Sequence, residues 1–325
     1  MDKAVLKISH ISKSFGKSDI LKDINLKFYP GEIFGLIGAS ASGKTTLLRT
    51  IIGFLEPEKG KVFFRKEHLL SHENGSEKFK EVLKDPAGIK EIVGFAAQTP
   101  SFYEELTLKE NLEYFGSLYN LKKESIASNL KTLLGLMNLN DSINLKASQL
   151  SGGMKRRLDM ACALIHDPQV LILDEPTSDL DPILRKHVWE LVRKINKKGT
   201  TIIIASHNLK EIEEICDRIA IIKDHRVLKV GTTEEIREEF SEAEEIHLES
   251  FPGNYEKIME LPSKYRKQII NTEQKATEFI IYTKKPEYIL HELLHKIEKE
   301  KETIIQLKVK KPDLDEIFVS LSANK

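Results

Sequence analysis

The sequence predicts an α/β fold, followed by a small α+β domain. Short runs of branched aliphatic residues at 32–38, 170–173 and 201–205 have the composition of buried central strands. Segments of helical periodicity lie between these runs, and this alternation is typical of sheets with right-handed crossover connections. A change of composition near Ser241, where glutamates crowd the chain, indicates that a second domain begins there.

The 325 residues are therefore expected to form one domain at 1–240 and another at 241–325. Alternating apolar and polar residues at 5–15 and 20–28 predict two half-buried strands at the start of the first domain. The second domain is predicted to contain strands at 244–250, 264–272, 275–283 and 302–309, and helices at 253–261, 286–300 and 313–321. The first six of these elements have the order β-α-β-β-α-β of a ferredoxin-like module.

Composition excludes few classes of protein. Fifty basic and fifty acidic residues cancel, so no global field indicates a nucleic-acid partner, and we expect none. No apolar run approaches the roughly 20 residues that span a bilayer, and the N-terminus lacks the apolar core of a secretion signal. We therefore expect a cytoplasmic chain. Its two cysteines, Cys162 and Cys216, lie in apolar helical patterns and are expected to be buried thiols.

Residues 38–45, GASASGKT, satisfy the phosphate-loop pattern G-x-x-x-x-G-K-[ST] between a predicted strand and a predicted helix. Backbone N–H groups and the helix N-terminus would surround an anion. Lys44 would reach the β- and γ-phosphates, and the hydroxyl of Thr45 would bind Mg²⁺. The residues expected to bind the phosphates are Gly38, Ala39, Ser40, Ala41, Ser42, Gly43, Lys44, Thr45 and Thr46.

Ala41 stands where a loop that wraps an anion usually relies on glycine. Two outcomes are open. Either Ala41 tolerates a strained backbone, which costs on the order of 1 kcal/mol, or the loop is looser and binds its phosphate ligand severalfold more weakly.

The run VLILDEP predicts a buried strand that ends in two carboxylates, Asp174 and Glu175. Asp174 is expected to hold the metal ion, directly or through water, and Glu175 to orient and deprotonate an attacking water. Two solvated carboxylates at a strand end are the alternative. The phosphate loop in the same chain favours the catalytic interpretation.

A second anion-binding helix end is predicted within QLSGGMKRRLDMACALI, which starts at Gln149. Ser151, Gly152 and Gly153 place a hydroxyl and bare N–H groups ahead of a segment with helical periodicity. A glycine turn before a helix is the alternative, but it does not explain why this segment directly precedes the strand that carries Asp174 and Glu175.

The order of these motifs resembles the ATPase cassette of ABC transporters over about residues 5–236, and LSGGMKRR at 150–157 is similar to the signature of that family. The resemblance implies a P-loop NTPase core with a mixed β-sheet, an antiparallel β subdomain and a helical subdomain at about 99–165. It also implies ATP and Mg²⁺ as ligands. In this family two cassettes, identical or sister chains, face head to tail, and each ATP lies between the phosphate loop of one and the signature of the other.

Further residues match the family by position. Gln98 matches the glutamine that contacts Mg²⁺ and senses the membrane subunit, and His207 matches the histidine that contacts the γ-phosphate. Asp181 belongs to the loop that crosses the dimer, in which Asp179 replaces the usual alanine or glycine. Phe15 resembles the aromatic residue that stacks on adenine, with a core phenylalanine as the alternative. The expected catalytic set is Lys44, Gln98, Glu175 and His207.

The resemblance implies a separate transmembrane permease as partner, so that the chain is peripheral on the inner face of the cell membrane. The segment VKKPDLDEIFVSL at 309–321 resembles the ending of cassettes from multidrug exporters and favours export. An ATPase of the same superfamily that acts on DNA or ribosomes is the alternative; the absence of long coiled-coil heptads and the single LSGG motif disfavour it. The segment 66–90 is longer and more charged than in most cassettes, and a surface insertion is expected there.

Overall fold

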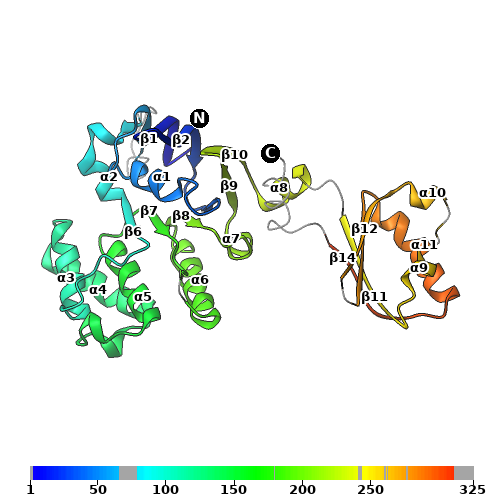
Figure 1. Cartoon of the computed structure of the whole chain (residues 1–325). Coiled ribbons are helices and arrows are strands. Elements are labelled where there is room, and N and C mark those ends of the chain that lie inside the picture. Colours follow the sequence, from blue (N-terminus) through cyan, green and yellow to red (C-terminus); the bar gives the residue numbers. More distant parts are fainter. Residues whose placement is uncertain are drawn as a thin grey trace. The chain divides into compact units, whose positions relative to one another are not determined.

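The computed structural model describes residues 3–65, 79–178, 180–240, 244–259, 261, 263–275 and 277–310. The chain forms two compact units, Met1–Thr232 and Thr233–Lys325 (Figure 1). The first unit ends before the predicted position 240, because the helix α8 (Thr233–Phe240) groups with the second unit. Most of the segment 66–90 that we expected to be an insertion, and the whole predicted helix 313–321, lie outside the described residues.

The first unit is built on a six-stranded sheet with the order β10-β9-β3-β8-β7-β6 (Figure 1). Its strands are β3 (Ile33–Ile37), β6 (Val93–Ala96), β7 (Val170–Asp174), β8 (Thr201–Ser206), β9 (Arg218–Lys223) and β10 (Arg226–Gly231). All neighbours are parallel except β10, which runs antiparallel to β9. Every residue of β3, β7 and β8 is buried, which confirms the central strands predicted from their aliphatic composition.

An antiparallel sheet with the order β2-β1-β4-β5 forms the second layer of this unit. Its strands are β1 (Leu6–Phe15), β2 (Ser18–Phe28), β4 (Lys59–Phe64) and β5 (Lys80–Glu81). The helix α1 (Lys44–Ile51) contacts β2 of this sheet and β7 and β8 of the other. One cluster of buried side chains, including Ile24, Leu47 and Ile172, joins both sheets through α1. This core holds the start of α1 in place relative to the end of β7.

Three mutually contacting helices, α3 (Leu108–Leu118), α4 (Lys123–Met137) and α5 (Gly152–Leu164), form the predicted helical subdomain. Thr107 and Glu110 make the capping box that starts α3. The other helices of the unit are α2 (Pro86–Ile92), α6 (Pro182–Asn196) and α7 (Leu209–Ile215), with short 3₁₀ turns at Val82–Lys84, Asn140–Ser142 and Ala147–Gln149. Among the helices that the structure describes, none is long and apolar enough to cross a membrane.

The second unit contains an antiparallel sheet with the order β12-β13-β11-β14. Its elements are β11 (Glu244–Phe251), α9 (Tyr255–Ile258), α10 (Ser263–Arg266), β12 (Ile269–Lys275), β13 (Glu278–Thr283), α11 (Pro286–Lys299) and β14 (Thr303–Lys310). Apolar residues of β11 and β13 pack against the helices, for example Leu248 against the cluster that contains Leu293.

This order of elements is the one that the sequence predicts, with one difference. The predicted helix 253–261 is only the short helix α9, a second short helix, α10, lies at the start of the predicted strand 264–272, and the strand itself begins at Ile269. The sequence reads Leu261-Pro262 between the two helices, and a residue before proline is biased away from the helical backbone.

Candidate functional site

A cavity of about 450 Å³ lies at the carboxyl ends of the parallel strands, at the N-terminus of α1. Its lining residues are Phe15, Ile20, Ser40, Ala41, Ser42, Gly43, Lys44, Thr45, Thr46, Gln98, Glu175 and His207. The fold thus brings together residues from β1, the phosphate loop and the segments after β6, β7 and β8. Ligand sites in open α/β sheets occur at this edge.

The phosphate loop requires glycine at two positions. Gly43, the N-cap of α1, has φ 105°, and a Cβ atom there would lie 2.5 Å from the carbonyl oxygen of Ile20. A Cβ atom on Gly38 would lie 2.5 Å from Ser42 Oγ and 2.7 Å from the carbonyl oxygen of Ile222. Only glycine fits where the backbone approaches its neighbours this closely.

Ala41 has φ 64°, in the left-handed region, and its side chain is exposed. The loop therefore keeps the turn that glycine would favour, and the alanine accepts the strain of on the order of 1 kcal/mol. Of the two outcomes that the sequence left open, the structure shows the strained backbone.

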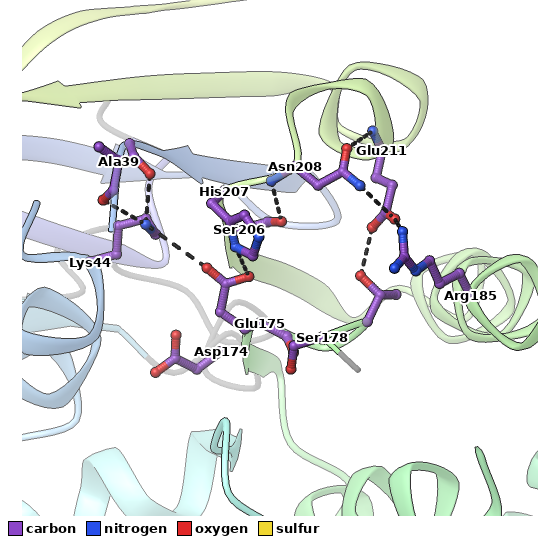
Figure 2. A network of polar contacts seen from close by, with 12 residues as sticks. Ala39, Lys44, Asp174, Glu175, Ser178, Arg185, Ser206, His207, Asn208 and Glu211 are labelled. Atoms are coloured by element: carbon purple, nitrogen blue, oxygen red, sulfur yellow. Dashed lines mark hydrogen bonds and ion pairs between the residues drawn. The ribbon is translucent and has the colours of Figure 1, made fainter. Parts of the chain in front are cut away.

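The side chain of Lys44 is held within the loop (Figure 2). It is only 6% exposed, and its Nζ donates hydrogen bonds to the carbonyl oxygens of Gly38 (2.7 Å) and Ala39 (3.1 Å). Its Nζ lies 3.9 Å from Glu175 Oε1. Burial lowers the pKa of Lys44, while the carboxylates of Glu175 and Asp174 raise it. The lysine places a compact positive charge at the floor of the loop.

Asp174 ends β7 and is 1% exposed. Burial raises its pKa, and a hydrogen bond with the Thr45 side chain lowers it. Its Oδ1 has no hydrogen-bond partner among the described residues. A buried carboxylate oxygen without a partner is costly, and hard divalent cations prefer oxygen ligands of this kind. Asp174 and Thr45 together therefore fit a Mg²⁺ ion.

Glu175 faces both Lys44 and His207 (Figure 2). His207 follows β8, and its Nδ1 lies 2.9 Å from Glu175 Oε2. Glu175 has φ 49°, outside the usual region for a residue with a side chain, and its backbone N–H donates to the carbonyl oxygen of Ala205 (2.9 Å). Strained backbones of this kind cluster at functional sites and persist only where neighbouring contacts fix them.

Gln98 and Phe15 complete the cavity from two other directions. Gln98 is exposed just after β6. Phe15 ends β1 and is 51% exposed, so it is not the core phenylalanine that was the alternative interpretation. Lys13 Nζ lies 5.5 Å from the centroid of the Phe15 ring. The ring is available to a flat ligand at the mouth of the cavity.

The signature residues do not line this cavity. Ser151 caps α5, its hydroxyl accepting a hydrogen bond from the N–H of Met154 (3.4 Å), and Ser151 and Gly152 are exposed. A Cβ atom on Gly153 would lie 2.8 Å from Leu184, so this glycine allows close packing of α5 on α6. The N-terminus of α5 is an open surface.

Asp181 does not line the cavity either, and it caps α6. Its Oδ1 accepts hydrogen bonds from the N–H groups of Ile183 (2.9 Å) and Leu184 (3.0 Å). Asp179 lies outside the described residues.

Sequence reasoning missed Glu211, which joins two segments of the site (Figure 2). Its carboxylate accepts hydrogen bonds from Thr177 Oγ1 (2.6 Å) and Asn208 Nδ2 (2.9 Å), and lies 3.5 Å from an Arg185 nitrogen. Asn208 is the N-cap of α7 and directly follows His207. The cap residue with glutamate three positions later was the available signal, but it indicates a helix start and not a site.

A phosphate loop with its lysine, together with a buried aspartate at the end of a parallel strand, defines a P-loop nucleoside triphosphatase. The sequence matches the ABC transporter family over residues 21–178. It is 30% identical to the Nod factor export ATP-binding protein I of Rhizobium sp. (strain N33), over 99% of this chain and 98% of that protein. The linearmycin resistance ATP-binding protein LnrL of Bacillus subtilis (strain 168) is 29% identical, over 98% of each chain.

Among solved structures, cbiO1 from Clostridium perfringens, described as part of the ABC transporter complex cbiONQ, is similar with a TM-score of 0.62 and 26% identity. The match covers 73% of this chain and 92% of that one. The chain belongs to the ATP-binding family of ABC transporters and is an ATPase.

Proposed function

We propose that this chain is the ATP-hydrolysing subunit of an exporter and drives transport through a separate membrane-spanning permease on the inner face of the cell membrane. The observation that carries the catalytic part is the pairing of Glu175 with His207 beside the unpartnered oxygen of Asp174. The names of the relatives support export: one is an export protein and the other a resistance protein, while cbiO1 is part of a multi-subunit transporter complex.

ATP is held by several parts of the cavity at once. The N–H groups of the phosphate loop and the N-terminus of α1 bind the phosphates, and Lys44 neutralises their charge. Phe15 stacks on the base, a contact worth about 1–3 kcal/mol. Thr45, Asp174 and Gln98 would hold Mg²⁺, which would neutralise charge that develops on the phosphate oxygens.

Hydrolysis depends on Glu175 and His207, which contact each other at 2.9 Å in the wall of the cavity. Glu175 accepts a proton from the attacking water and orients it, which contributes about 10²–10⁴ in rate, or roughly 3–5 kcal/mol. His207 contacts the γ-phosphate and keeps the Glu175 carboxylate aimed into the cavity. Lys44 Nζ lies 3.9 Å from Glu175 Oε1, so the positive charge of the lysine faces this carboxylate in the site.

The catalytic unit is a pair of cassettes, formed either by two copies of this chain or by this chain and a sister subunit. The exposed Ser151 and Gly152 present a helix N-terminus that the chain's own cavity does not use. In a head-to-tail pair this end binds the γ-phosphate of the ATP on the other cassette, so ATP holds the pair together and its hydrolysis releases it.

The variant Glu175→Gln tests the catalytic assignment. We expect ATP affinity within about twofold of wild type, and turnover lower by about 10²–10⁴, because the amide cannot accept the proton. Fluorescent-ATP titration and phosphate release measure the two quantities. Wild-type turnover in this variant would remove Glu175 from the mechanism. Export itself is tested by co-purification with a membrane subunit, whereas co-purification with ribosomes or DNA would support the rival function.

A further inference from the structure

Arg156 is a buried arginine on α5, the helix that begins at the signature residues. It is 7% exposed. Its guanidinium donates three hydrogen bonds to backbone carbonyl oxygens: Nε to Pro176 (2.9 Å), Nη1 to Ala97 (2.8 Å) and Nη2 to Asp174 (3.0 Å). None of these acceptors lies on α5, so the side chain links this helix to two other segments.

The three acceptors flank functional residues. Asp174 and Pro176 are the immediate neighbours of Glu175, and Ala97 directly precedes Gln98. Glu175 itself has the strained φ of 49°. A strained residue keeps its conformation only when its neighbours are fixed, and Arg156 fixes the carbonyl group on each side of it.

The charge partner of Arg156 extends the link. Arg156 Nη1 lies 3.4 Å from Oδ2 of the buried Asp159, one turn further along α5. Asp159 Oδ1 accepts hydrogen bonds from the N–H (3.0 Å) and hydroxyl (3.2 Å) of Ser101, three residues after Gln98. The pair therefore holds the segment of Gln98 at two points.

Charge neutralisation alone does not explain this arrangement. The contact with Asp159 is the longest of the four, while the three short bonds go to carbonyl groups of the site segments. The planar fork of a guanidinium can reach several acceptors at fixed angles, and the single ammonium of lysine cannot.

We infer that Arg156 is a positioning residue that sets the Glu175 carboxylate and the Gln98 segment relative to the signature helix. The inference rests on the proposed role of Glu175. It gives the open end of α5 a rigid connection, within one chain, to the catalytic carboxylate. A phosphate bound at Ser151 and Gly152 would then influence the positions of the Glu175 carboxylate and the Gln98 segment in the same chain.

The test is ATP turnover and ATP binding by the full-length variants Arg156→Lys and Arg156→Gln. Misplacement of a catalytic group by about 1 Å costs up to about 100-fold in rate, so we expect kcat to fall about 10- to 100-fold while KM changes less than about threefold. Arg218→Lys is the matched control, because Arg218 bonds Glu32 and lies over the rings of Tyr29 and Phe34. Its kcat should stay near wild type.

A double-mutant cycle separates positioning from a purely structural role. In the Glu175→Gln background, Arg156→Lys should cause little further loss, because its effect acts through Glu175. Equal losses in both backgrounds would overturn the inference. The inference would also be overturned if the kcat of the Arg156 variants were no lower than that of Arg218→Lys. Normal turnover of Glu175→Gln alone would instead overturn the proposed function.

Asp159→Asn keeps the test decisive if the arginine variants do not fold. Asparagine retains the acceptor for Ser101 but removes the negative charge beside Arg156. We expect a smaller fall in kcat, of about threefold to tenfold, with KM unchanged. A folded Asp159→Asn protein with wild-type kcat, alongside unfolded Arg156 variants, would assign the pair to stability and contradict the inference.

Discussion

Two helices of the same cassette begin with glycine-containing segments, and they differ in how complete their anion sites are. The N-terminus of α1 lies inside a cavity, with Lys44 buried and bonded to the loop that precedes it. The N-terminus of α5 is exposed at Ser151 and Gly152 and lies outside that cavity. The nearest lysine on α5, Lys155, is paired at 2.7 Å with the exposed Glu104.

The difference fits the proposed function, in which one chain supplies a whole phosphate site and only part of a second. The loop before α1 carries strained or glycine-only positions at Gly38, Ala41 and Gly43, as expected of a backbone shaped around a ligand. Ser151 makes an ordinary helix cap, and Gly152 has open space around it. On the proposed function, the N-terminus of α5 binds a ligand only when a paired cassette brings one to it.

The largest expected effect is at the complete site. Lys44→Ala should weaken ATP binding at least about 100-fold, or roughly 3 kcal/mol, because it removes the buried cation that faces the phosphates. Lys155→Ala is the matched control on the other helix, and its ATP affinity should equal wild type. Fluorescent-ATP titration of the single chain measures both. Equal losses of ATP affinity in Lys44→Ala and Lys155→Ala would contradict the claim that the two helix ends differ.

A smaller effect is expected at the open end. Gly152→Asp should leave ATP binding to the single chain within about twofold and lower turnover about tenfold, or ~1.4 kcal/mol, because a carboxylate there repels the phosphate of a paired cassette. Gly152→Ala is the control, since, apart from its own helix and chain neighbours, no atom of the described residues lies within 4 Å of the Cβ position. Phosphate release and ATP titration give the two readouts. If Gly152→Asp hydrolyses ATP as fast as Gly152→Ala, the α5 end is not an anion site.

The smallest effect is expected at Ala41. Since the loop already holds the left-handed backbone, Ala41→Gly should change ATP affinity less than about twofold and the free energy of unfolding by no more than about 1 kcal/mol. Gly43→Ala should instead disrupt ATP binding, because its Cβ atom meets the Ile20 carbonyl oxygen at 2.5 Å. Thermal unfolding and ATP titration compare the two. A large gain in affinity for Ala41→Gly would show that the alanine loosens the loop.

The sequence could predict those parts of the site that are local in the chain. The aliphatic strands, the phosphate loop and the carboxylates at the end of β7 each form a short continuous pattern, and the structure places them together. The sequence does not decide between the two interpretations of Phe15, because it does not show whether a ring at the end of a strand is covered.

Arg156 and Glu211 could not be found from sequence, because their roles depend on contacts between distant segments. Arg156 reaches a carbonyl group 59 positions away, and backbone acceptors carry no signal in the side-chain pattern. From the sequence alone, Glu211 is a residue in the first turn of a helix. In the fold, its Oε2 lies 2.6 Å from Thr177 Oγ1. In the second unit, the order of the predicted elements was predictable, while their boundaries shifted around Leu261-Pro262, where the predicted helix ends early and α10 takes the start of the predicted strand.

The central claim is that ATP joins the complete site of one cassette to the open helix end of another. Sedimentation of the full-length Glu175→Gln variant with Mg²⁺ and ATP tests it most directly, because we expect this variant to bind ATP without hydrolysing it. We expect a dimer with ATP, a monomer with ADP, and a monomer with ATP when Gly152→Asp is added. If the true partner is a sister subunit, dimer formation in a mixture of the two chains should depend on the nucleotide in the same way. ATP-saturated protein that stays monomeric, both alone and with its sister or membrane subunit, would contradict the account.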